Sequence, residues 1–144
     1  MIGCSIRWWQ MNNILERYIG APWADNGTDD NGFDCWGLLV HVYRTFYDIN
    51  IPETYTYNLE NKIRTTKLIE EVTQTPSWQE IATPVEGCAV GLSQNKHIHH
   101  VGVWIDDACL HANRRFGVVY QNLRQLNMSG YSLIKFYQYQ GGKV

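Results

Sequence analysis

The chain lacks the features that mark a membrane protein or a nucleic-acid-binding protein. No apolar run approaches the roughly 20 residues that a membrane-spanning helix needs, and polar residues interrupt any apolar core near the start. We therefore expect a soluble protein without membrane insertion or a signal peptide. The 12 Lys and Arg residues are scattered and the formal net charge is −2, which argues against a nucleic acid partner.

Repeats, low-complexity tracts and linkers are also missing. At 144 residues the chain is long enough for one hydrophobic core and too short for two, so we expect a single domain over residues 1–144. Aromatic residues, by contrast, make up 13% of the chain, with 6 Trp and 9 Tyr. Such rings fill a small core or line a binding groove, and we expect them to do both.

Cysteine is scarce, and none of the four residues lies in a CxxC motif: Cys4, Cys35, Cys88 and Cys109. The spacing therefore suggests neither a zinc knuckle nor a redox motif. The number of cysteines alone would allow two disulfides. A nucleophilic cysteine must stay reduced, however, and would leave an odd number of cysteines to pair. That favours synthesis in a reducing cytoplasm and leaves the disulfide state of the other three cysteines open.

Helical patterns come first in the chain and strand patterns follow. We expect helices over residues 11–19, 34–48 and 59–74, and strands over residues 88–93, 100–105, 108–113, 118–121 and 133–139. The stretch 20–33 is rich in Gly, Pro, Asn and Asp and is predicted to be a loop. Helices followed by short antiparallel strands is the order of an α+β fold.

The second expected helix begins at a cysteine. Cys35 follows the polar loop directly, and Asp34 is placed to cap the free N–H groups of the first turn. A thiol there meets the positive end of the helix dipole, which favours the thiolate, and the free N–H groups can hold an oxyanion. Helical periodicity turns Cys35 toward the core. The plainer interpretation is that Cys35 only fills space and Asp34 only caps the helix.

Two histidines fall where they can serve this cysteine. If Asp106 and Asp107 form a two-residue turn between strands 100–105 and 108–113, His111 shares a face with His100, one diagonal step away. Gly102 leaves room for the two rings. We predict that His100 takes the proton of Cys35 and that His111 binds the far ring nitrogen of His100.

Both motifs resemble those of the NlpC-type cell-wall peptidases. The segments are GFDCWGLLVHVYR at residues 32–44 and HHVGVWIDDACLHA at residues 99–112; the family motifs run Gly-Phe-Asp-Cys-Ser-Gly-Leu-Val and His-Val-Gly-Ile-Tyr. The resemblance implies a papain-like α+β fold, with N-terminal helices packed on a small antiparallel sheet or barrel. It also implies a cysteine endopeptidase that cuts peptidoglycan stem peptides, typically between D-glutamate and a diamino acid, without a cofactor.

The resemblance further implies roles and a setting. Cys35 would be the nucleophile, His100 the general base and His111 the residue that orients the base. The Trp after the cysteine, the closing Val-Tyr-Arg and the Leu-His-Ala are similar to the branch found in bacteriophage and prophage tail proteins. That branch implies other tail proteins as partners, and a virion tail acting at the bacterial cell wall as the location.

Two positions that read the substrate in this family differ here. Trp23 stands where relatives carry a Tyr after Pro, and Trp36 stands where they carry Ser. We expect Trp23, Trp36 and Asp34 to contact the substrate, and Arg114 to bind a stem-peptide carboxylate. A pair such as Arg114 and Arg115 is more often simply part of a solvated surface.

A metal site is one alternative. The zinc-type donors are His97, His99, His100 and His111 with Cys88 or Cys109. Strand alternation turns His97 and His99 away from His100, which splits the cluster, so we expect no metal.

A non-catalytic tail module is the other alternative. It would bind the cell wall or serve a structural role, and Trp23, Trp36 and Trp104 would form its binding surface. No motif residue is replaced by an inert one, which favours catalysis.

Overall fold

A computed structural model describes residues 8–51, 74 and 76–141 of the chain. The elements are α1 (Trp8–Tyr18), β1 (Thr28–Asp29), β2 (Gly32–Phe33), α2 (Cys35–Phe46), β3 (Trp78–Ile81), β4 (Ala89–Ser93), β5 (His100–Ile105), β6 (Ala108–Asn113), β7 (Gly117–Gln121), α4 (Leu123–Met128) and β8 (Leu133–Tyr139). Within this described part, no helix combines the length and apolar character needed to cross a bilayer.

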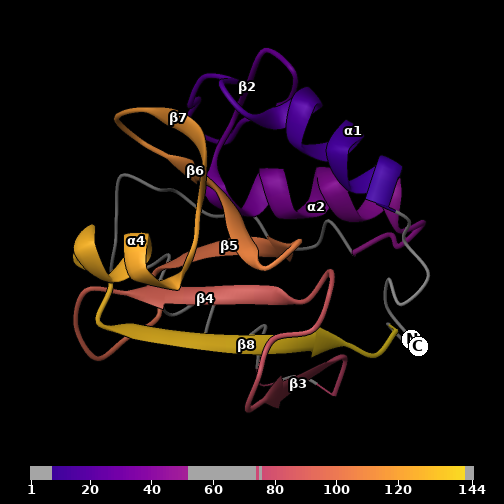
Figure 1. Ribbon diagram of the computed structural model, residues 1–144. Coiled ribbons are helices and arrows are strands. Elements are labelled where there is room, and N and C mark those ends of the chain that lie inside the picture. Colours follow the sequence, from indigo (N-terminus) through magenta and orange to yellow (C-terminus); the bar gives the residue numbers. More distant parts are fainter. Residues whose placement is uncertain (1–7, 52–73, 75, 142–144) are drawn as a thin grey trace.

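Six strands form an antiparallel sheet in the order β3-β8-β4-β5-β6-β7, and α1 and α2 lie along one side of it (Figure 1). Alternate residues of β5 divide between the two faces. Val101, Val103 and Ile105 join the core beneath α2, whereas Trp104 joins a second cluster that includes Leu126 of α4. Helices packed on an antiparallel sheet confirm the predicted α+β class.

The β5–β6 hairpin follows the predicted register. Ile105 pairs with Ala108 and Val103 with Leu110 across a two-residue turn. Both turn residues have positive φ, 47° at Asp106 and 69° at Asp107, as a type I′ turn requires. The register places His111 on the His100 face of the hairpin.

Several element boundaries differ from the prediction. The first helix begins at Trp8 rather than at residue 11, and the loop 20–33 contains the short pair β1 and β2. Neither β3 nor α4 was predicted: β3 is a four-residue edge strand, and α4 spans six residues, too few to show a helical period. The expected helix 59–74 lies, apart from residue 74, outside the described residues.

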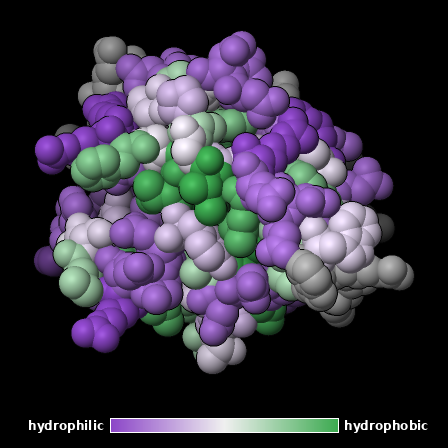
Figure 2. Space-filling model, turned by 45° about the horizontal axis from the view of Figure 1, so that its top comes forward, coloured by the Kyte–Doolittle hydropathy of each residue, from purple (hydrophilic) through white to green (hydrophobic). Residues whose placement is uncertain are grey.

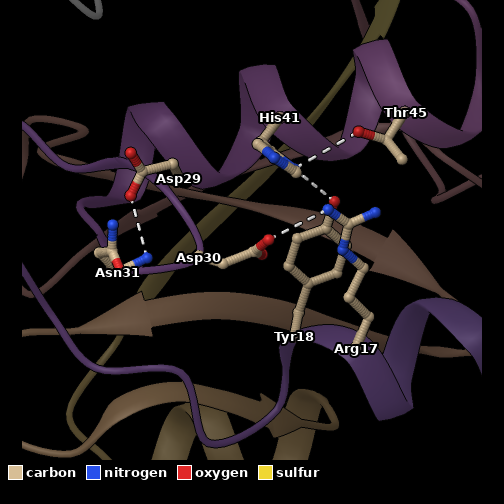
Figure 3. A network of polar contacts seen from close by, with 7 residues as sticks. All are labelled: Arg17, Tyr18, Asp29, Asp30, Asn31, His41 and Thr45. Atoms are coloured by element: carbon tan, nitrogen blue, oxygen red, sulfur yellow. Dashed lines mark hydrogen bonds and ion pairs between the residues drawn. The ribbon is translucent and has the colours of Figure 1, made fainter.

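Polar contacts join α1 to α2 and to the loop between them (Figure 3). The buried Tyr18 hydroxyl lies 2.6 Å from Nδ1 of His41, and Oγ1 of Thr45 lies 3.4 Å from the same nitrogen. At the surface, Nη2 of Arg17 lies 3.3 Å from Oδ2 of Asp30. These contacts hold α2, and with it the cysteine at its start, against the rest of the helical layer.

Candidate active site

The N-terminus of α2 is fixed by its cap and by close packing. Asp34 is 1% exposed, and its carboxylate accepts a hydrogen bond of 2.6 Å from the Gly37 N–H, which confirms the predicted cap. A Cβ at position 37 would overlap the carbonyl oxygen of Gly27, so this turn presses directly against the loop. Cys35 is therefore held in one place by backbone geometry.

Cys35 itself is buried, with 1% of its surface exposed. Burial, and after it the negative charge of Asp34, raise the pKa of its thiol to about 12. Backbone hydrogen bonds at Val101 and Trp36 act in the opposite direction and do not offset this. The predicted effect of the helix start, which favours the thiolate, is thus outweighed by desolvation, and the thiol is neutral near pH 7.

The two predicted histidines are in direct contact. Nε2 of His100 lies 2.9 Å from Nδ1 of His111, and the rings meet edge to face with centroids 5.1 Å apart. Gly102 makes room, since a Cβ there would lie 2.7 Å from the Leu110 carbonyl oxygen and 3.0 Å from Cβ of His111. Burial lowers the pKa of both rings, so both are neutral near pH 7.

Cys35 and the histidine pair meet around β5 and Tyr131. One backbone partner of the Cys35 sulfur is Val101, the residue after His100. Tyr131, which sequence reasoning missed, stacks on His100 with centroids 5.8 Å apart and 6° between the planes. Burial raises the pKa of Tyr131, and the ionised form of Cys35 would raise it further, which places the tyrosine near the cysteine. Tyr131 sits in a loop, where no periodicity signals its position.

A second missed residue lies on the far side of His111. Oε1 of Gln121, at the end of β7, lies 2.8 Å from Nε2 of His111. Nε2 of Gln121 donates to Oγ of Ser129 at 3.1 Å. The β6–β7 register pairs His111 with Val119, which makes Gln121 a diagonal neighbour, so a correct strand alignment could have found it.

The predicted substrate residues separate into two groups. Trp23 and Arg114 come together at the surface: the guanidinium lies over the indole ring, 5.6 Å from its centroid, and both side chains contact Asp25. Trp36, in contrast, is 8% exposed and belongs to the core. Trp104 is also buried, so the three-tryptophan surface of the non-catalytic alternative does not form.

Apolar residues reach the surface in a patch near the middle of one face, framed by polar residues (Figure 2). Among the described residues, no group of three or more His, Cys, Asp or Glu side chains is arranged to hold a metal ion. Cys35, Cys88 and Cys109 are free and buried thiols.

A helix that begins at a buried cysteine and packs on an antiparallel sheet with paired histidines is the architecture of a papain-like protein. The pattern of the NlpC/P60 family matches residues 20–135, and the chain belongs to this family. This confirms the family that the two motifs predicted. No curated protein sequence matches the chain.

Two solved structures show the same fold. The NlpC/p60 domain of the peptidoglycan hydrolase SagA is 18% identical with a TM-score of 0.56, and the match covers 83% of this chain and 92% of that one. A protein of Staphylococcus aureus subsp. aureus Mu50, described as similar to lipoprotein of the NLP/P60 family, is 19% identical with a TM-score of 0.54. That match covers 88% of this chain and 39% of the staphylococcal one.

Proposed function

We propose that this protein is a cysteine peptidase that hydrolyses an amide bond in peptidoglycan stem peptides. The observation that carries the proposal is the buried Cys35 at the start of α2, beside a strand that presents a hydrogen-bonded His100–His111 pair. Family membership and the fold shared with the hydrolase SagA support the substrate class.

In the proposed mechanism, His100 takes the thiol proton as the Cys35 sulfur attacks the carbonyl carbon. The backbone N–H of Cys35, at the helix start, donates to the oxyanion. The C–N bond then breaks while His100 returns the proton to the leaving amine, and a thioester remains on Cys35. Water, deprotonated by His100, attacks the thioester, and the proton returns to the sulfur. His111 holds the ring of His100 throughout.

For substrate recognition we propose the Trp23–Arg114 pair. Arg114 is about half exposed, with its side chain at 54%, and its guanidinium lies over the indole ring of Trp23. Such a cation suits a stem-peptide carboxylate. With this recognition we propose the bond between D-glutamate and the diamino acid as the one cut, since family resemblance favours it.

We also propose that the enzyme works in a phage or prophage tail, together with other tail proteins at the cell wall. The support is the motif resemblance, carried by Trp36 and by the Val-Tyr-Arg and Leu-His-Ala segments. Antibody labelling of tailed particles from an induced lysate tests this: label on tails is expected, and label only in the particle-free fraction would contradict it.

One observation favours the alternative of a non-catalytic wall-binding module. The high pKa of Cys35 leaves its thiol unactivated, as expected of a protein that does not catalyse hydrolysis. Two assays on purified peptidoglycan separate the functions. The peptidase releases new amino groups with wild type and not with Cys35→Ala. A binding module releases none with either protein, and both sediment with the wall material equally.

A further inference from the structure

The hydrogen-bonded histidines belong to a longer polar chain that ends at Gln121 and Ser129. We infer that Gln121 is a positioning residue that fixes the ring tautomer of His111 and, through it, that of His100. The inference rests on the proposed function for its consequence in catalysis. The assignment of each proton to a ring nitrogen depends only on the hydrogen bonds.

Each hydrogen bond along this polar chain fixes the position of one proton. A neutral imidazole has one N–H and one lone pair. The Gln121 carbonyl oxygen only accepts, so Nε2 of His111 carries the hydrogen and Nδ1 of His111 has the lone pair. That lone pair accepts from Nε2–H of His100. Nδ1 of His100 is then left with a lone pair, which is the state a general base for Cys35 requires.

The reverse arrangement would disable the base. If Nδ1–H of His111 donated to Nε2 of His100, the lone pair of His100 would already be used. The other nitrogen of His100 would carry a proton and could not accept one from Cys35. Both arrangements fit the distance of 2.9 Å between Nε2 of His100 and Nδ1 of His111. The group on the other side of His111, which is Gln121, therefore selects between them.

Burial makes Gln121 the deciding group. His111 has no exposed surface, so bulk water does not replace the amide as acceptor. The Gln121 amide presents its oxygen to the ring of His111, while its NH2 group donates to the Ser129 hydroxyl at 3.1 Å. No carboxylate of the described residues is among the groups that shift the pKa of either ring: these are His111 and His99 for His100, and Gln121 for His111, besides burial.

The first test reads the tautomers directly. In the full chain with ¹⁵N-labelled histidine, at a pH where both rings are neutral, we expect Nε2–H and unprotonated Nδ1 for His100 and His111. Gln121→Leu should remove this preference at His111, whereas Gln121→Glu should keep it because a carboxylate also only accepts. Gln79→Leu, an equivalent change on an exposed residue of the opposite edge strand, should change nothing. Unchanged tautomers in Gln121→Leu would overturn the inference.

The second test asks for the kinetic consequence. Gln121→Leu is expected to lower kcat about 10- to 100-fold with little change in KM, as loss of a group that orients a catalytic base does. Gln121→Glu should restore most of kcat and move the acid limb of the pH–rate profile to higher pH, because its charge favours the imidazolium. A Gln121→Leu variant with full kcat and an unshifted profile would overturn the role in catalysis.

The two tests separate the inference from the proposed function. If wild type releases no amino groups from peptidoglycan, the peptidase proposal fails, and the tautomer measurement still decides the role of Gln121. If Gln121→Leu does not fold, Gln121→Asn replaces it. The Asn side chain stays polar, but it is one methylene shorter, so its amide oxygen cannot reach Nε2 of His111. Retained tautomers in Gln121→Asn would count against the inference equally.

Discussion

Among single residues, Cys35 matters most, because the proposed reaction depends on the protonation state of its thiol. The pKa of this thiol is raised to about 12, chiefly by burial, so in the proposed mechanism the thiolate forms only as the proton leaves for His100. We expect alkylation of Cys35 by iodoacetamide to be slow at about pH 7 and to accelerate roughly tenfold per pH unit above it. The rate is measured by mass spectrometry, with Cys35→Ala correcting for alkylation of the other three cysteines. A fast, pH-independent rate around neutrality would show a resting thiolate and contradict this account.

The histidines should differ in their effect on turnover. Replacing His100 by Ala removes the proposed base and is expected to lower kcat by orders of magnitude, as Cys35→Ala does. His111→Ala should cost less, because His111 contacts only the far nitrogen of His100. His97→Ala, at an exposed position of the same segment, serves as the matched control. Equal losses for His111 and His97 variants would remove His111 from the mechanism.

At the scale of elements, the contact between α1 and α2 depends on a buried hydroxyl. Tyr18→Phe removes the 2.6 Å bond to His41 and leaves the ring nitrogen with only the longer contact to Thr45. We expect the free energy of unfolding to fall by about 1–3 kcal/mol. Arg17→Ala, which removes an exposed ion pair of the same interface, should cost about 0–1 kcal/mol. Urea titration measures both, and a larger loss for Arg17→Ala would contradict the ranking.

The elements also show what sequence can and cannot predict. The β5–β6 hairpin could be predicted from the alternation of side chains along the strands and from the two-residue turn. The contact between His100 and His111 follows from that hairpin. Gln121 depends on the next register, between β6 and β7, and β7 begins at Gly117 rather than at the expected residue 118. The pKa of the Cys35 thiol depends on how completely Cys35 is buried between α2 and the sheet. That burial is a property of packing rather than of the local sequence pattern.

At the scale of the whole molecule, buried histidines couple stability to pH. Burial lowers the pKa of His41, His100 and His111 below the ordinary value of 6.5, so below that pH the unfolded chain binds more protons than the folded one. Their contribution to stability is complete above pH 6.5 and is lost as the pH falls toward the folded-state pKa values. Glu86, whose pKa burial raises, acts in the opposite direction.

We therefore expect the free energy of unfolding to decrease as the pH is lowered from 6.5. His41→Gln should reduce that slope by removing one contributor, whereas His97→Gln, at an exposed site, should leave it unchanged. Urea titrations at a series of pH values give the slopes directly. Identical slopes for wild type and His41→Gln would contradict the assignment.

The central claim is that Cys35 cleaves a peptide bond of the cell wall. The most direct measurement is digestion of purified peptidoglycan by wild type and by Cys35→Ala, with the fragments identified by mass spectrometry. We predict stem-peptide fragments from wild type only, with masses that name the bond cut. Equal cleavage by both proteins would contradict the thiol mechanism, and no cleavage by either would contradict the peptidase.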